Sequence, residues 1–269
     1  MPSADEIRAA QRQTWDKFSG GWEKWDEVVL NTVSSVADAI IANLALRDDQ
    51  VHLDVASGTG EPGLTIAAKA PRGHVTLTDL SPEMLSVAQR RAARMGITNV
   101  SFQECGAEDL PFPDTTFDSV SCRFAFMFVP DVTKAIAEFM RVAKPGGRVC
   151  TAVWAGPEHN PWTTVPMVAI SSEVQLPPPD PDGPGMFRWA QPGLLSDRFR
   201  DAGLRDVHEE DVDTLMVADS PQQYWELVQE LTAPVVMAME QVDAAARERI
   251  EAKILERAKA YESGGRVEP

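Results

Sequence analysis

The sequence predicts an α/β fold: a doubly wound, mostly parallel sheet with an N-terminal helical lid and C-terminal helical additions. Three observations support this prediction. From residue 51 onward, short apolar runs alternate with segments of helical periodicity, which is typical of strands joined by crossover helices. The first apolar run is followed by a glycine-rich loop, Gly58 to Gly63. The N-terminal residues 4–46 have helical periodicity of their own.

The N-terminal segment, residues 4–46, is expected to be helical. From Val28 to Leu44 its apolar residues recur at three- and four-residue steps, which forms one apolar helix face. Before this face come four aromatic residues interrupted by Gly20-Gly21, namely Trp15, Phe18, Trp22 and Trp25. Such aromatics can pack in a core or cover a ligand as a lid, and the sequence does not decide between the two.

The central part of the chain is expected to form five strands. They are predicted at residues 51–55, 75–78, 99–104, 117–122 and 148–154, with helices at 63–70, 82–95 and 131–143. The second helix has the clearest boundaries, because Ser81 can cap its free amides, Pro82 suits its first turn and Gly96 ends it. Sheets of this kind bind ligands at the carboxyl ends of their strands, where the chain order reverses.

The pattern weakens after Trp154. A proline-rich loop at 177–185 is either a functional flap or disordered, a helix is expected at 192–202, and a strand within 204–217. Two more helices are expected at 221–231 and 236–261. We therefore divide the chain into an N-terminal helical lid (1–46), a ligand-binding α/β core (47–154), and a third part (155–269). The third part contains a substrate-side loop, the remaining sheet strand and the C-terminal helices.

Composition and charge exclude several classes of partner. With 25 basic and 41 acidic side chains the formal net charge is −16, a field that repels phosphate backbones, so no nucleic-acid partner is expected. The three cysteines form no C-x-x-C pair, and neither a disulfide framework nor a metal site is predicted. The first ten residues contain no apolar core of a signal peptide, and no apolar run approaches the roughly 20 residues of a membrane span. A cytoplasmic location without a membrane span is therefore expected, and the oligomeric state is left open.

The glycine-rich loop indicates a ligand with a positive end. Gly58 to Gly63 formally matches G-x-G-x-x-G, which alone is a weak indication of a dinucleotide site. Asp54 and Glu61 bracket the loop and disfavour a pyrophosphate, whereas a carboxylate at Asp54 suits the amino group of a methionine moiety. Asp79 lies 25 residues after Asp54 and can accept hydrogen bonds from both ribose hydroxyls of an adenosine. The alternative, that Asp79 caps the next helix, is less favoured because Ser81 is better placed to do so.

Four motifs, in order and at the expected spacing, resemble the class I S-adenosylmethionine-dependent methyltransferases, most closely their ubiquinone/menaquinone C-methyltransferase-like branch. They are Asp54–Gly60, Thr78–Leu85, Ala107–Asp114 with Phe117-Asp118, and Arg141–Gly147. The resemblance is strong over residues 50–154 and loose over 190–217. It implies that the core binds S-adenosyl-L-methionine, that S-adenosyl-L-homocysteine is the product, and that a small molecule accepts the methyl group on oxygen, nitrogen or carbon.

The resemblance also implies which residues hold the cofactor. Asp54 and the backbone from Ala56 to Gly60 should hold the methionine end, Asp79 the ribose, and Arg123 with Phe124 should border the cofactor. The complete set of expected cofactor-binding residues is Asp54, Ala56, Ser57, Gly58, Thr59, Gly60, Asp79, Leu80, Met84, Gly106, Ala107, Glu108, Arg123 and Phe124.

Two positions depart from the family. The family often has glycine where Ala56 stands, although alanine is tolerated in this branch. The second departure is at the adenine site. Leu80 should lie against the adenine, and Gly106 with Ala107 should face its edge. The family usually has an acidic or amide residue where Gly106 stands, to bond the adenine amino group. Glycine cannot make that bond, so Glu108 or a backbone carbonyl must substitute.

The acceptor side is less defined. A sulfonium carries its own activation, so the protein must mainly align the nucleophile and exclude water, although a base helps a hydroxyl acceptor. His159 is the candidate base, with an exposed loop histidine as the alternative interpretation. A flat or apolar acceptor pocket is expected from the aromatic residues Trp15, Trp22, Phe126, Phe128, Trp154 and Trp162.

Two alternative functions stay open at this point. The formal G-x-G-x-x-G match would also suit an NAD(P)-dependent oxidoreductase. The lack of a convincing base would also suit a non-catalytic relative of the fold that keeps the cofactor as a ligand.

Overall fold

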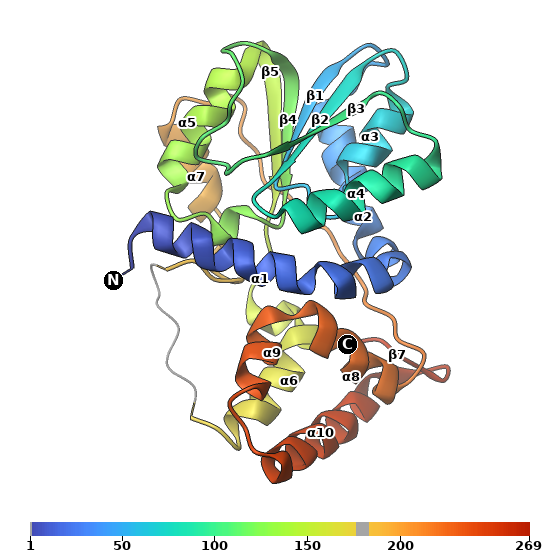
Figure 1. Cartoon of the computed structure of the whole chain (residues 1–269). Coiled ribbons are helices and arrows are strands. Elements are labelled where there is room, and N and C mark those ends of the chain that lie inside the picture. The colour runs from blue at the N-terminus through green and yellow to red at the C-terminus, as the bar shows by residue number, and fades with distance from the viewer. Residues whose placement is uncertain (1, 176–182) are drawn as a thin grey trace.

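A five-stranded sheet lies at the centre of the computed structural model, which describes residues 2–175 and 183–269 (Figure 1). The strands are parallel and follow the order β3-β2-β1-β4-β5, so the chain order reverses between β1 and β4. Their bounds are β1 (Val51–Val55), β2 (His74–Asp79), β3 (Val100–Glu104), β4 (Phe117–Arg123) and β5 (Ala143–Ala152). The predicted doubly wound parallel sheet is confirmed. Residues 177–182 of the predicted proline-rich loop lie outside the described residues.

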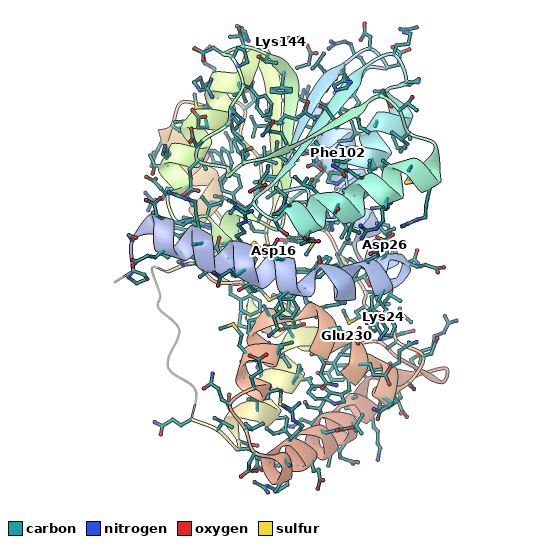
Figure 2. The ribbon with its side chains drawn as sticks, viewed as in Figure 1. Asp16, Lys24, Asp26, Phe102, Lys144 and Glu230 are labelled. Atoms are coloured by element: carbon teal, nitrogen blue, oxygen red, sulfur yellow. The ribbon has the colours of Figure 1, made fainter. Side chains whose placement is uncertain are left out.

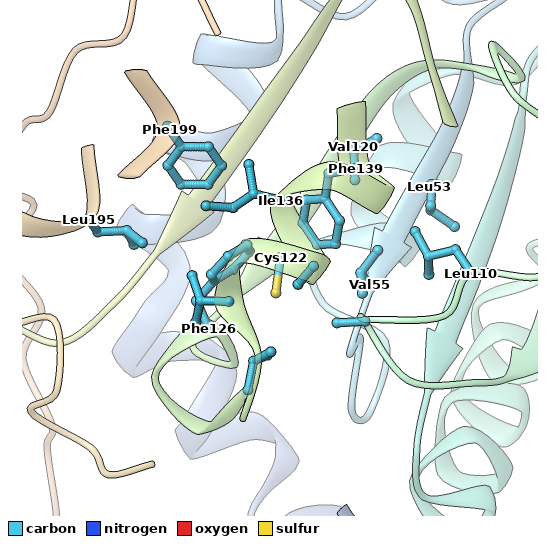
Figure 3. Packing of buried hydrophobic residues seen from close by; sticks show 14 of the residues in the cluster. Leu53, Val55, Leu110, Val120, Cys122, Phe126, Ile136, Phe139, Leu195 and Phe199 are labelled. Carbon is cyan, nitrogen blue, oxygen red and sulfur yellow. The ribbon is translucent and has the colours of Figure 1, made fainter. Parts of the chain in front are cut away.

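Helices cover both faces of the sheet (Figure 1). On one face lie α2 (Asp26–Leu44), α3 (Gly63–Lys69) and α4 (Pro82–Met95), whose apolar residues pack on β2. On the other lie α5 (Val132–Val142) and α7 (Leu194–Asp201). Figure 3 shows this second layer, in which Phe139 and Phe199 pack toward Phe126 and the side chains of β1 and β4.

The predicted helix boundaries in this core are confirmed by their caps. Ser81 Oγ accepts a hydrogen bond of 3.1 Å from the backbone N–H of Met84, and Gly96 ends α4 in the left-handed conformation. Asp131 caps α5 through the N–H of Lys134. These local signals fix where the chain enters each crossover helix and therefore where each loop meets the sheet edge.

Helix α1 (Ala4–Lys24) runs along the carboxyl end of the sheet, between the sheet and a separate group of helices (Figure 1). The helical structure predicted for residues 4–46 is confirmed as two helices: α1 continues through Gly20-Gly21, and α2 begins after Trp25. Gly21 allows close approach of a neighbouring helix, because a Cβ there would lie 2.5 Å from the backbone oxygen of Glu230. Figure 2 shows this crossing, where Lys24 donates to Glu230 over 2.9 Å.

The second group of helices, called here the helical body, is made of α6 (Pro161–Ser171), α8 (Pro221–Leu231), α9 (Ala233–Met239) and α10 (Ala244–Ala258). Helix α6 was not predicted, and the single helix predicted at 236–261 is two helices, because Asp243 caps a new start at Ala244. A short antiparallel pair, β6 (Glu262–Ser263) and β7 (Arg266–Val267), closes the body. Three single-turn 3-10 helices complete the described elements: η1 (Phe126–Phe128), η2 (Pro157–His159) and η3 (Lys259–Tyr261).

The strand predicted within 204–217 is wrong. That segment is irregular, and the nearest pairing is an isolated bridge between Ala218 and Val267. The segment contains the acidic run from Glu209 to Asp213, and such residues are disfavoured in strands. It is held by side chains instead, since Asn43 on α2 donates to Glu210 over 2.6 Å. Among the described residues the main sheet therefore ends at β5.

Helix α2 is apolar along its length. It has 19 residues and a mean hydropathy of 1.2, enough by length and composition alone to cross a membrane. Its buried residues Val36, Ile40 and Leu44 belong to the same core cluster as residues of α3 and β2. Packing on the sheet therefore accounts for its apolar face.

Candidate active site

A pocket opens along the carboxyl edge of the sheet, under α1. The empty space between its lining residues is about 900 Å³, which includes open solvent at its mouth. Because the strand order is β3-β2-β1-β4, its walls come in sequence from the ends of those four strands. The lining residues are Gln11, Trp15, Trp22, Ala56, Ser57, Gly58, Thr59, Glu61, Asp79, Leu80, Met84, Cys105, Ala107, Glu108, Arg123, Phe124, Ala125, Phe128, Val129 and Pro130.

The loop after β1 forms the floor of the middle of the pocket. Ala56 to Thr59 line it, whereas Gly60 turns away and packs on α3, where a Cβ would lie 2.7 Å from Leu64. Ala56 and Gly58 both have positive φ, which bends the chain sharply after the strand. A Cβ built at Gly58 would have no atom within 4 Å, so the space beside this residue is open. The backbone can therefore approach a ligand closely here.

Asp54 does not line the pocket, so its predicted contact with a methionine amino group needs correction. It is fully buried, and its oxygens accept hydrogen bonds from Gly63 N at 2.9 Å and Ser121 Oγ at 2.6 Å. A Cβ at Gly63 would lie 2.8 Å from Asp54 Oδ2, so only glycine allows this contact. Burial raises the pKa of Asp54 to about 7. In this structure Asp54 ties β1 to the start of α3 and to β4.

Asp79 lies in the pocket, between the loop after β1 and the end of β3. Its Oδ2 accepts from Gly58 N at 2.8 Å and its Oδ1 from Ser81 N at 2.9 Å. Burial raises the pKa of Asp79 to about 6. Each carboxylate oxygen has capacity for a second hydrogen bond, so the same carboxylate can hold the loop in place and accept bonds from a ligand.

Glu108 lies close to Gly106 at the edge of the pocket. Glu108 is 2% exposed and lines the pocket, whereas Gly106 does not. Glu108 Oε1 receives hydrogen bonds from Arg8 of α1 at 3.0 Å and from Asp131 N at 3.1 Å. Its Oε2 lies 3.8 Å from where a Cβ of Gly106 would be. A carboxylate oxygen of Glu108 therefore lies within van der Waals contact of the place where a side chain at Gly106 would begin.

The end of β4 forms the aromatic end of the pocket. Arg123 and Phe124 line it as predicted, with the guanidinium carbon 5.6 Å from the Phe124 ring. Trp154 stacks behind Phe124 with ring centroids 4.0 Å apart, and Trp162 packs behind Trp154 at 5.3 Å. Trp154 and Trp162 were predicted to contact substrate, but they support the wall from behind.

Helix α1 closes the other side. Trp15 and Trp22 line the pocket as predicted, and Gln11 joins them by donating to the backbone oxygen of Phe128 over 2.5 Å. Trp15 meets Phe128 edge to face, with centroids 5.8 Å apart. The N-terminal aromatics therefore act both as packing and as cover, which the sequence left open.

Two predicted residues of the acceptor side need correction. Phe126 is fully buried between Phe139 and Phe199, and its neighbour Phe128 faces the pocket instead. His159 lies on η2 with its side chain 70% exposed and is not among the lining residues. Its position on a surface turn, beside Glu158, does not suit a base for this pocket.

None of the four histidines lines the pocket. His52 is buried in β1 between the hydroxyls of Ser119 and Ser121, and burial lowers its pKa to about 3. His74 and His208 are exposed.

Several lining residues were not predicted as site residues: Gln11, Glu61, Cys105, Ala125, Val129 and Pro130. Gln11 lies one helical turn before Trp15, a spacing that places both on one helix face, so the aromatic pattern could have indicated it. Glu61 was recognised only as a charge beside the loop. Val129 and Pro130 give no signal in the sequence, because they reach the pocket through the turn after η1.

The lining fits S-adenosylmethionine better than a dinucleotide. It contains three carboxylates, Glu61, Asp79 and Glu108, and one cation, Arg123, a balance that suits a sulfonium and opposes a pyrophosphate. In the described part of the chain Ser57 Oγ and Trp22 Nε1 are buried without a hydrogen-bond partner, and both residues line this pocket. Buried polar atoms without partners are costly, and a polar ligand can satisfy them. The same described residues contain no cluster of three metal-ligating side chains.

Comparisons with known proteins agree with this geometry. Residues 53–147 match the family described as methyltransferase domain. The ubiquinone/menaquinone biosynthesis C-methyltransferase UbiE of Brucella anthropi is 44% identical over 115 residues, which are 41% of this chain and 44% of that protein. The chain therefore matches less than half of the length of this relative.

Solved structures share the fold over a larger part of the chain. An S-adenosylmethionine-dependent methyltransferase from Thermotoga maritima has 20% identity and a TM-score of 0.52, covering 72% of this chain and 81% of that one. The [4+2]-cyclase SpnF has 21% identity and a TM-score of 0.57, covering 96% and 92%. At these identities the similarity shows the fold alone.

Proposed function

We propose, from the match of residues 53–147 to a methyltransferase domain and from the similarity to a ubiquinone/menaquinone biosynthesis C-methyltransferase, that this chain transfers a methyl group from S-adenosylmethionine to a small-molecule acceptor. The observation that carries the proposal is the position of Asp79, buried in the pocket between the glycine loop and the end of β3. S-adenosylmethionine supplies an electrophilic methyl group on a sulfonium. The tasks left to the protein are binding, alignment and the exclusion of water.

The cofactor side of the pocket follows the sheet edge. Asp79 is placed to accept hydrogen bonds from ribose hydroxyls, and Leu80 with Ala107 offers apolar contact for an adenine. Glu108 Oε2 supplies an acceptor for an exocyclic amino group in place of a side chain at Gly106. In this assignment Glu108 takes the role of the family's acidic residue, although it stands two positions after Gly106 in the sequence.

The acceptor side is flat and apolar. Trp15, Phe124 and Phe128 form its walls, and α1 covers it from solvent. Because no histidine lies in the lining, the pocket favours an acceptor that is nucleophilic at neutral pH without a strong base, such as a phenolate, an amine or an activated aromatic carbon.

The oxidoreductase alternative has less support. A dinucleotide would place two phosphate charges in a lining that holds three carboxylates and Arg123 as its one cation. The non-methylating alternative needs a direct test, because a [4+2]-cyclase has the same fold. Binding of the cofactor alone would therefore not establish the reaction.

The first experiment measures binding. Wild-type protein should bind S-adenosylhomocysteine in isothermal titration calorimetry, and NADH should give no heat. Asp79→Ala should weaken binding by about 100-fold or more, because it removes a charged acceptor and loosens Gly58. His159→Ala is the matched control and should bind normally, since its side chain lies outside the pocket. Normal affinity in Asp79→Ala would contradict the ribose assignment.

The second experiment measures transfer. Isotope-labelled S-adenosylmethionine is incubated with a panel of phenols, amines and quinone precursors, with Asp79→Ala as the inactive reference. Label transfer by the wild type and not by the variant supports the proposed reaction. Tight binding of S-adenosylhomocysteine without transfer to any member of the panel would favour the non-catalytic relative.

A further inference from the structure

Two side chains at the β1 and β4 end of the pocket have polar atoms without partners. The first is Glu61, which follows the glycine loop and is 6% exposed. Its Oε2 accepts from Arg91 Nη2 at 3.1 Å and from Thr65 Oγ1 at 3.0 Å. In the described part of the chain Oε1 makes no hydrogen bond, and Glu61 lines the pocket. One oxygen of this nearly buried carboxylate can therefore accept a hydrogen bond from a ligand.

The second is Arg123, at the end of β4. Its Nε donates to the backbone oxygen of Glu61 over 3.0 Å, which fixes the plane of the guanidinium. Among residues 2–175 and 183–269 neither terminal nitrogen, Nη1 or Nη2, has a hydrogen-bond or ion-pair partner, and Arg123 also lines the pocket. Guanidinium donors of this kind pair with carboxylates in a fixed, planar geometry.

In the described part of the chain the Glu61 carboxylate and the Arg123 guanidinium form no hydrogen bond or ion pair with each other. Arg91 is buried below the loop, and it holds the Glu61 carboxylate from one side while its Nε lies 3.6 Å from Asp26 of α2. Glu61 in turn holds Arg123 through its main chain and not through its carboxylate. The result is a free carboxylate oxygen and a free guanidinium edge, both at the junction of β1 and β4.

An α-amino acid end matches this arrangement, because it has an ammonium and a carboxylate on the same carbon. We propose that Glu61 Oε1 accepts a hydrogen bond from the ammonium, and Arg123 donates to the carboxylate, of the amino-acid end of S-adenosylmethionine. The inference rests on the proposed function. It gives to these two residues the contact that the sequence suggested for Asp54, whose oxygens bond Gly63 and Ser121 outside the pocket.

The test uses three ligands that differ only at this end. S-adenosylhomocysteine has both charged groups, its decarboxylated analogue keeps only the ammonium, and 5′-methylthioadenosine has neither. Affinities are measured by calorimetry for the wild type, Glu61→Gln, Arg123→Met and the control Glu83→Gln, an exposed carboxylate on α4.

The proposal predicts a specific pattern. Arg123→Met should lose about 10- to 100-fold in affinity for S-adenosylhomocysteine and bind the decarboxylated analogue as the wild type does. Glu61→Gln should weaken both of these ligands by a similar factor and leave 5′-methylthioadenosine unchanged within about twofold. Glu83→Gln should change none of the three affinities.

The outcomes separate this inference from the proposed function. Unchanged binding of 5′-methylthioadenosine by Glu61→Gln shows that the variant is folded, and a thermal melt checks this independently, since the substitution also weakens the pairing of Arg91. If both variants bind all three ligands like the wild type, or lose all three in parallel, the Glu61–Arg123 assignment is wrong while the proposed function stands. If the wild type binds none of the ligands, the proposed function fails and this inference fails with it.

Discussion

Asp54 and Asp79 lie near the carboxyl ends of neighbouring parallel strands, and the directions of their oxygens give them different roles. Asp54 has its oxygens turned toward Gly63 and Ser121, inside the protein. Asp79 lies at the wall of the pocket, where each oxygen bonds one backbone N–H and can accept from a ligand as well. For both carboxyl groups burial raises the pKa, and this disfavours the ionised form.

The raised pKa of Asp54 predicts how stability depends on pH. Because the folded-state pKa of about 7 is above the unfolded value, the native state binds this proton more tightly. The contribution is fully present below about pH 4 and is lost as the pH rises to 7, with a slope of at most about 1.4 kcal/mol per pH unit. Asp54→Asn cannot titrate and should lose less stability between pH 4.5 and 7.5 in urea unfolding. Equal slopes in both proteins would contradict the buried, protonatable carboxyl.

The sequence could indicate residue types at the site more readily than their orientation. Asp79 was predicted from its position at the end of a strand, because ligands bind at the carboxyl edge of a parallel sheet. Leu80 and Phe124 were predicted from the family resemblance, and all three residues line the pocket. Phe126 and Phe128 lie two residues apart, and which of them faces the pocket is decided by the 3-10 turn η1, which has no clear sequence signal. The exposure of His159 likewise depends on the turn η2, formed where the sequence was irregular.

Helix α1 connects the two parts of the molecule and covers the site. On the sheet side, Arg8 bonds Glu108 and Ser81 donates to Asp16 over 2.6 Å. On the other side, Lys24 and Trp25 Nε1 both donate to Glu230 of α8. The position of this cover therefore depends on how closely α1 and α8 can approach.

Two adjacent glycines in α1 allow a matched test of that approach. A Cβ at Gly21 would lie 2.5 Å from the backbone oxygen of Glu230, whereas a Cβ at Gly20 would meet no atom within 4 Å. Gly20→Ala should stabilise the protein by about 0.5–1 kcal/mol, since alanine costs less entropy in a helix. Gly21→Ala should destabilise it by about 1–3 kcal/mol through overpacking. Urea unfolding of both variants checks this, and stabilisation by both would mean that the helices are not in close contact.

Element boundaries were predictable where local chemistry sets them, and were missed where distant contacts do. The caps Ser81 and Asp131 act within one turn, so α4 and α5 were placed correctly. The break between α1 and α2 at Trp25 was not predicted within the helical segment 4–46, and there Trp25 donates to Glu230, 205 residues away in the chain. The segment 204–217 forms no strand, in keeping with its acidic run, but its hydrogen bond to Asn43 of α2 could not be read from the local pattern.

At the scale of the whole molecule, the net charge of the chain and the net charge of the pocket lining are both negative. The chain has a formal charge of −16, and the pocket lining has three carboxylates against one arginine. A negative field attracts cationic ligands and is screened by salt, with a screening length of about 10 Å at 0.1 M. The net charge could be predicted from the sequence. The clustering of negative charge in the pocket could not, because only the fold brings Glu61, Asp79 and Glu108 together.

This field should distinguish the substrate form of the cofactor from its product. At neutral pH S-adenosylmethionine has a net charge of +1, because of its sulfonium, and S-adenosylhomocysteine has none. Raising NaCl from 20 to 500 mM should therefore weaken binding of the sulfonium form by about two- to fivefold more than binding of the product. Paired calorimetric titrations measure this, and the product serves as the matched control for general effects of salt. Identical salt dependence for the two ligands would show that the carboxylates of the lining do not act on the sulfonium, and would favour selection by shape alone.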